Sequence, residues 1–194
     1  MNIVKWKLSC MLIGFIGSVL FSCGQEPASL KRDTRFFDLA AFIETQSILL
    51  DSLQPKVRKK VTIGDTVEEK IVSETNWAKE LELFDQADIS KPALQTSYEI
   101  EEQSEQIRVY KAKANENPNV KYIKTTLDSK TGQIVSLEAL ISRNNYLYHS
   151  EKKIWLQCRI SPQGKSQISA YRISGMQKLI FNDQVPYHIE AEIL

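Results

Sequence analysis

The chain contains 194 residues with a formal net charge of +1, and 42% of its residues are hydrophobic. This length and composition predict one domain with an apolar core of its own. Basic and acidic residues are nearly equal in number, so no strongly basic face is expected, which argues against nucleic acid as a partner.

An apolar segment with a basic start opens the chain. Lys5 and Lys7 precede the uncharged stretch 8–22, which ends at Ser22, just before Cys23. This is the layout of a secretory signal. A helix over that stretch would extend about 22 Å, short of the ~30 Å hydrocarbon core of a bilayer. A permanent transmembrane helix is therefore the weaker interpretation.

The end of this segment resembles the lipobox of bacterial lipoproteins. Leu20 stands three residues before Cys23, and the small residue Ser22 comes directly before it, although Phe21 is bulkier than is usual at its place. The resemblance implies cleavage before Cys23, a diacylglyceryl thioether on its sulfur and an acylated, palmitate-type new N-terminus. The alternative is an ordinary secreted protein with an incidental cysteine.

The resemblance also divides the chain into three parts. Residues 1–22 are the expected signal peptide, residues 23–33 the lipidated cysteine and a polar tether, and residues 34–194 a single α+β domain. Gly24 follows the cysteine, where the inner-membrane retention signal of enteric bacteria has Asp. By that analogy, the expected location is the outer membrane, with the periplasmic or surface face left open.

The domain is predicted to begin with a helix over residues 33–53, in which apolar residues recur near a 3.6-residue period. Asp33 or Thr34 is expected to cap its start, and Pro55 follows its end. The apolar stripe is broad, so the helix needs a large apolar surface to pack on.

A hairpin and a short helix are expected next. Two runs of β-branched residues flank Gly64 and Asp65, which is typical of a β-hairpin with a two-residue turn. Residues 76–87 then have helical periodicity. The apolar face of that short helix carries Trp77, Leu81 and Phe84.

From about residue 94, short apolar runs alternate with turn-forming residues at spacings typical of antiparallel strands. The candidate strands are residues 107–109, 120–127, 134–141, 147–149, 154–160, 168–173, 179–181 and 189–193. Two of them alternate between apolar and polar residues, which indicates one buried and one solvated face. We therefore expect an α+β fold: a curved antiparallel meander of about seven to nine strands wrapped around the N-terminal helix, plus one short helix.

This outline loosely resembles the half-barrel lipoprotein carriers of the Gram-negative envelope, in which a curved sheet encloses helices and leaves an apolar cavity. It also loosely resembles cystatin-like and NTF2-like folds. The likeness is architectural, and fold alone does not define function.

Residues typical of catalytic sites are scarce. His149 and His188 are the only histidines, and His188 falls among the polar positions of its strand. Once Cys10 and Cys23 are assigned to the signal and the anchor, only Cys158 remains, so no internal disulfide is expected. Cys158 occupies an apolar position, which predicts a buried, inert thiol. We therefore predict no catalytic residue, no metal and no cofactor.

Aromatic residues cluster in the second half of the chain and are the candidate contacts for a ligand or partner. The candidates are Trp155, Tyr146, Tyr148 and Tyr171. Trp155 is expected to face outward, because both of its neighbours are apolar residues of the buried face. Aromatic residues that instead point inward belong to the core.

Three functions are compatible with these features. The first is a non-enzymatic accessory or binding subunit, anchored by Cys23, that docks on another envelope protein. The second is a carrier or sensor of an apolar ligand, such as a lipid or a lipoprotein acyl chain, held between sheet and helix. The third is a hydrolase with an unfamiliar arrangement of groups. An apolar cavity would distinguish the second from the first.

Overall fold

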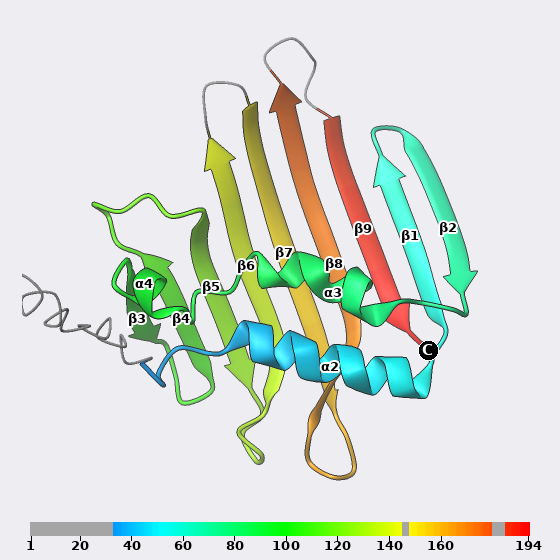
Figure 1. Cartoon of the computed structure of the whole chain (residues 1–194), viewed down its shortest axis with the longest axis horizontal. Coiled ribbons are helices and arrows are strands. Elements are labelled where there is room, and N and C mark those ends of the chain that lie inside the picture. The colour runs from blue at the N-terminus through cyan, green and yellow to red at the C-terminus, as the bar shows by residue number, and fades with distance from the viewer. Residues whose placement is uncertain (1–32, 145–147, 180–184) are drawn as a thin grey trace, which may run out of the picture. The chain divides into compact units, whose positions relative to one another are not determined.

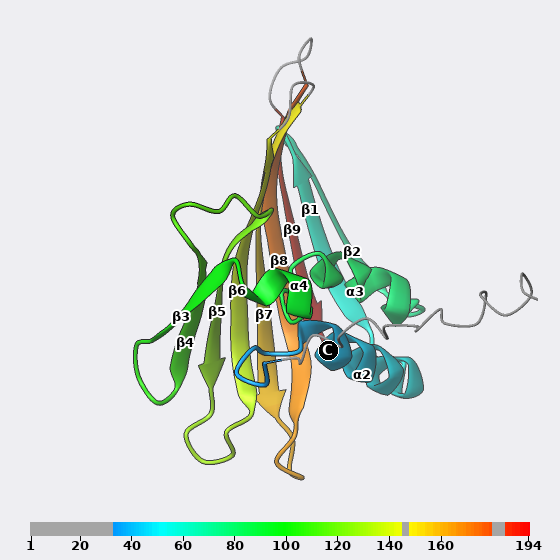
Figure 2. The same cartoon turned by 60° about the vertical axis from the view of Figure 1, so that its left-hand side comes forward.

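The computed structural model describes residues 33–144, 148–179 and 185–194, which lie in one compact unit of the chain, Arg32–Leu194. Nine antiparallel strands of these residues form one open sheet, and the two longer helices lie across one of its faces (Figures 1 and 2). The fold is therefore largely β. The expected α+β class is therefore confirmed in part: the antiparallel sheet and helices are present, but the strands outweigh the few helices.

Helix α2 (Leu39–Leu53) begins later than predicted. Its N-cap is Asp38, whose carboxylate accepts the backbone N–H of Ala41 at 3.1 Å. The carboxylate of Asp33 instead accepts the N–H of Arg35 at 3.0 Å, which holds a turn before the helix. Two further helices, α3 (Trp77–Asp85) and α4 (Pro92–Gln95), follow in the chain.

The predicted hairpin is confirmed. Strands β1 (Val57–Ile63) and β2 (Thr66–Val72) are joined at Gly64, whose φ of 55° is the left-handed conformation that glycine adopts readily. The other side of β1 pairs with β9, the last strand of the chain. This distant pairing places the hairpin at the edge of the sheet. No local sequence pattern predicts that β1 pairs with β9.

The other strands run consecutively from one edge of the sheet to β9, and the order across the sheet is β2-β1-β9-β8-β7-β6-β5-β4-β3. Their bounds are β3 Tyr98–Glu102, β4 Ile107–Ala112, β5 Val120–Leu127, β6 Ile134–Asn144, β7 Tyr148–Ile160, β8 Ser166–Leu179 and β9 Val185–Ile193. The meander is therefore confirmed.

Some strand predictions need correction. The candidates at 147–149 and 154–160 belong to one strand, β7, from residue 148 onward, because polar residues such as Glu151 and Lys152 continue the backbone pairing with both neighbouring strands. Residue 147 lies outside the described residues. The candidate at 179–181 reaches the end of β8 at Leu179, and its last two residues lie outside the described residues. The short, acidic strand β3 was not among the candidates.

The core lies between the helices and the sheet. Helix α3 contributes Trp77, Leu81 and Phe84, all fully buried, as the sequence predicts. Full burial of such side chains contributes about 1.5–3 kcal/mol each relative to exposure. On α2, the buried amide of Gln46 bonds to β8, donating to the carbonyl of Ser166 at 3.0 Å and accepting the N–H of Ile168 at 2.9 Å.

None of the helices in the described part of the chain is long and apolar enough to cross a membrane. The expected signal peptide, Cys23 and most of the tether lie outside the described residues.

Candidate functional site: an aromatic cleft beside α2

Residues 33–38, which we call the strap, lead into α2 and are fixed by two side chains. The Gln95 amide accepts the backbone N–H of Asp33 at 2.9 Å and donates to the carbonyl of the same residue at 3.2 Å. The hydroxyl of Tyr110 on β4 bonds to the strap backbone on either side of Phe36, accepting an N–H at 3.1 Å and donating to a carbonyl at 3.0 Å. The strap is therefore held at a defined distance from the sheet.

A cleft of about 470 Å³ opens between the strap, the first turn of α2 and strands β4–β6. We call it the aromatic cleft. Its apolar lining is Phe36, Phe37, Phe42, Tyr110, Leu127 and Ile134. Polar residues complete the lining: Thr34, Arg35, Asp38, Arg108, Thr125 and Gln133, together with Gly132. The volume falls within the range of about 300–1,000 Å³ that is typical of small-molecule sites.

The aromatic rings of the cleft are arranged in two pairs. Phe36 stacks on Tyr110 with ring centroids 5.4 Å apart, and both residues are buried. Phe37 and Phe42 form a tilted pair at 5.6 Å, and both are only partly buried. The first pair therefore forms the rigid base of the cleft, and the second leaves apolar surface for a ligand.

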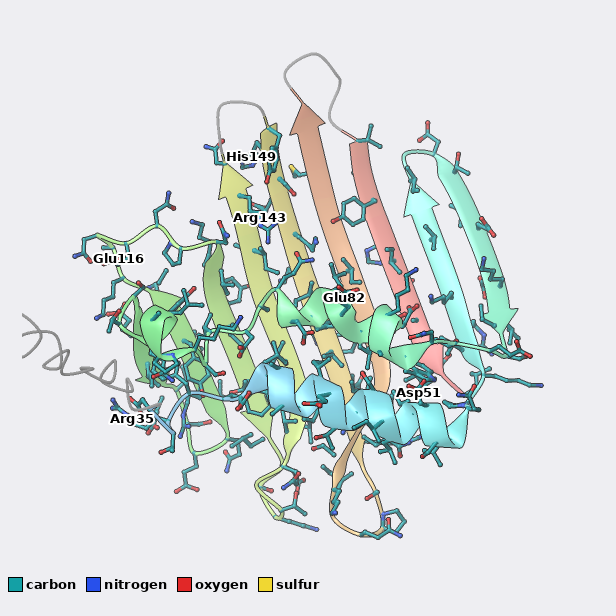
Figure 3. The ribbon with its side chains drawn as sticks, in the orientation of Figure 1. Arg35, Asp51, Glu82, Glu116, Arg143 and His149 are labelled. Carbon is teal, nitrogen blue, oxygen red and sulfur yellow. The ribbon has the colours of Figure 1, made fainter. Side chains whose placement is uncertain are left out.

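Charged groups stand around this apolar lining. Arg108 donates to the carboxylate of Glu102 at 3.0 Å and to the carbonyl of Arg35 at 3.3 Å. The side chain of Arg35 pairs with Asp33 at 2.7 Å, and this contact lowers the pKa of the Asp33 carboxyl. Figure 3 places Arg35 beside the start of α2. The cleft is thus apolar with both signs of charge nearby, an arrangement suited to an apolar group with a polar end.

Sequence reasoning did not find this cleft. The sequence predicts a helix that begins at residue 33 and so includes the strap, whereas the helix begins at Leu39. The usable signal is the pair of aromatic residues just before Asp38, an N-cap residue type. A residue that precedes the N-cap lies outside the helix, so its side chain is free to line a cleft beside the helix.

The structure separates the predicted aromatic contacts. Trp155 is partly buried on the solvent face of the sheet, with the Arg172 guanidinium 4.4 Å from the ring centroid. Tyr171 is only 1% exposed. It is therefore a core residue, which is the alternative given above for aromatic residues that point inward. Tyr148 lies partly buried near the start of β7, and Tyr146 lies outside the described residues. The three of these residues that the structure describes do not line the aromatic cleft.

Tyr171 belongs to a polar contact that ties α3 to the sheet. Its hydroxyl donates a hydrogen bond to the carboxylate of Glu80. The same carboxylate accepts a hydrogen bond from the ammonium group of Lys59 on β1, with Nζ and Oε2 2.6 Å apart. Burial, together with the Glu80 charge and hydrogen bond, raises the pKa of the Tyr171 hydroxyl above its usual value. This contact holds α3 against the sheet, and the Tyr171 hydroxyl is already hydrogen-bonded to Glu80.

One serine–histidine–glutamate arrangement occurs on the solvent face of the sheet. The Oγ of Ser174 lies 2.7 Å from Nδ1 of His188, whose Nε2 lies 3.3 Å from Glu190. Acyl transfer also needs N–H donors directed at an oxyanion. Ser174 and His188 lie opposite each other in the ladder between β8 and β9, where backbone N–H groups serve the sheet, and neither lines a described hollow.

The remaining chemical candidates are separate from one another. Cys158 is buried, as predicted, and burial raises the pKa of its thiol to about 12. His149 is partly buried on β7, and Figure 3 shows it near Arg143 at the end of the sheet away from α2. Within the described ranges, no three His, Cys, Asp or Glu side chains are grouped as metal ligands.

Two further hollows differ from the cleft in lining. A groove of about 590 Å³ between α2 and α3 has small residues such as Ala41 and Ala78 beside four acidic residues, among them Asp51 and Asp85. Burial and the neighbouring Asp88 raise the pKa of the Asp85 carboxyl. A hollow of about 340 Å³ on the solvent face has a lining with equal numbers of cations and carboxylates. The first has no aromatic residue in its lining, and the second has Tyr171 alone, without the paired rings of the aromatic cleft.

No protein-family model matches this chain, and no curated protein matches it at a significant level.

Proposed function

We propose that this chain is a non-enzymatic binding protein of a bacterial cell envelope, anchored through lipid on Cys23 and acting as an accessory subunit of another envelope protein. The outer membrane is the proposed location. Two or more acyl chains would hold the protein stably, at roughly 0.8 kcal/mol per buried methylene group. The polar tether would then keep the domain close to one membrane face.

The aromatic cleft is the observation that carries this proposal. In our account the sheet curls around α2, as the sequence predicts, and the cleft is the open end of that arrangement. Phe37 and Phe42 are only partly buried, and aromatic residues are enriched in protein interfaces relative to the rest of the surface. The cleft would receive an apolar side chain of the partner.

A second feature supports docking on a protein. Ile48 and Leu53 on the solvent side of α2 are 65% and 54% exposed. Neither residue lines the aromatic cleft, and Leu53 ends the helix away from it, so the two would offer a partner additional apolar surface along α2 rather than widen the cleft.

The alternative is a carrier or sensor of an apolar ligand, and the position of the cleft favours it specifically. The cleft lies where the strap and α2 meet the sheet, the region in which such a ligand was expected. The rest of the contact between α2 and the sheet is occupied by buried side chains such as Leu39, Ile43 and Leu50. In the part of the chain that the structure describes, a lipid would therefore enter at this end.

The anchor and the cleft have separate tests. For the anchor, Cys23→Ser should move the full chain from the membrane to the soluble fraction and abolish incorporation of labelled palmitate. Unchanged membrane retention would contradict the anchor while leaving the cleft untouched.

For the cleft, the tagged full chain is crosslinked in cells, captured and compared with Phe37→Ala and Trp155→Ala variants. We expect one envelope protein to be captured by the parent chain and by the Trp155→Ala control, and to be lost with Phe37→Ala. Organic extracts of the same captures test the carrier: a lipid that is lost with Phe37→Ala, without any captured protein, would favour it.

A further inference from the structure

The edge strand β2 carries a charge pattern that is complementary to itself. Among the described residues, β2 ends the strand order of the sheet, and Figure 1 shows it at the border beside β1. All its residues except Val72 are exposed. Most proteins protect such an edge, because its unpaired N–H and C=O groups bind other strands.

The register defines which backbone groups of β2 are available. Ile63 and Thr66 flank the two-residue turn and pair with each other, and the N–H of Gly64 bonds to β9 through Pro186 at 3.1 Å. Because the direction of these bonds alternates along a strand, residues 66, 68, 70 and 72 bond to β1. The N–H and C=O groups of Val67, Glu69 and Ile71 therefore point away from the sheet.

We propose that the chain forms a homodimer by antiparallel pairing of β2 with β2 of a second copy, with the two-fold axis at Glu69. In this register Val67 faces the partner copy's Ile71, Glu68 faces its Lys70, and the outward-pointing backbone groups of both copies meet. Each dimer would gain about six backbone hydrogen bonds.

The side chains favour this register over its neighbours. Val67 and Ile71 are 56% and 58% exposed, and the pairing covers both in each copy. Glu68 and Lys70 already lie 3.7 Å apart within one strand, and in the dimer each also meets an opposite charge of the other copy. A shift by two residues in either direction would oppose Glu68 to Glu68 or Lys70 to Lys70.

The like-charge pair on the axis is compensated locally. Each Glu69 has Lys60 as its cross-strand neighbour on β1, so the axis carries two lysines beside two glutamates. The opposite edge offers no such match. Strand β3, Tyr98–Glu102, has three glutamates and no cation, and self-pairing about Ile100 would oppose Glu99 to Glu101.

The test uses the full chain in cells, with Glu69→Cys as the site for a short bismaleimide crosslinker. The parent chain controls for the native cysteines, and Glu101→Cys on β3 is the matched control for an exposed edge strand. We expect a band at twice the chain mass from Glu69→Cys and none above background from either control. A missing band, or a crosslink to a different protein, would overturn the proposal.

A charge-swap series in the Glu69→Cys chain tests the register. Glu68→Lys and Lys70→Glu each create two like-charge pairs across the interface and should weaken the dimer about tenfold. The double swap Glu68→Lys with Lys70→Glu restores opposite charges and should return the crosslinked fraction to the starting level. Equal crosslinking in all four chains, or no recovery in the double swap, would exclude this register. Thermal melts check that each variant folds.

Discussion

The Tyr110 hydroxyl donates a hydrogen bond to the backbone carbonyl of Arg35, 3.0 Å away, and so joins β4 to the strap. The same oxygen accepts the N–H of Phe37 at 3.1 Å. One side chain therefore sets the position of the residues that line one side of the aromatic cleft. The buried base of the cleft and the conformation of the strap depend on each other.

Replacing Tyr110 by Phe should destabilise the protein by about 1–2 kcal/mol, because the strap loses both hydrogen bonds while the stacking on Phe36 remains. Urea denaturation gives the free energy of unfolding. Arg35→Ala is the matched control, since it keeps the backbone carbonyl and removes only an exposed ion pair with Asp33, and it should change the free energy of unfolding much less than Tyr110→Phe does. Equal losses in both variants would mean that Tyr110 does not hold the strap.

Stability should fall as the pH rises above about 10. Burial raises the pKa of Tyr98 to about 12, and burial with a hydrogen bond to Glu138 does the same for Tyr122. A raised folded-state pKa means that the unfolded chain releases these protons first, so the stabilisation is complete below the unfolded pKa and is lost as the pH approaches 12.

The measurement is the free energy of unfolding in urea at several pH values from 9 to about 11.5. The Tyr98→Phe variant should show a shallower decline than the parent chain, because it carries one fewer raised pKa. A parallel decline in the two proteins would show that Tyr98 titrates equally in the folded and unfolded states.

Cys158 should resist alkylation in the folded protein. Its thiol is buried on β7, and burial raises its pKa to about 12, so almost no thiolate exists at neutral pH. Peptide mapping after iodoacetamide treatment should show this cysteine unmodified in buffer and fully modified in concentrated urea. Rapid labelling of the folded chain would show that the Cys158 thiol is accessible and activated. That result would contradict the prediction of an inert thiol and support a catalytic role for Cys158.

The sequence predicted the local elements well, because turn chemistry and periodicity are local properties. Strand β5 was predicted at its observed bounds, and the hairpin at Gly64 follows from its two-residue turn. The start of α2 was missed because Asp33 and Asp38 are equally good cap residues, and only tertiary contacts of the strap decide between them.

Contacts between residues far apart in the chain could not be predicted from the sequence. The pairing of β1 with β9 joins segments from opposite ends of the domain, and no local pattern encodes it. The aromatic cleft depends on Tyr110 reaching a strap more than seventy residues earlier in the chain. Tyr171 was a candidate surface contact, but its strand position placed it under α3, where aromatic side chains fill the core.

The binding role of the aromatic cleft is tested most directly by photo-crosslinking in cells from position 37. Benzoyl-phenylalanine replaces Phe37 in the full chain, and Trp155 on the solvent face of the sheet is replaced in a matched control. Our account predicts one discrete adduct from position 37, which mass spectrometry identifies as an envelope protein or, for the carrier alternative, a lipid. An adduct from position 155 with none from position 37 would contradict it.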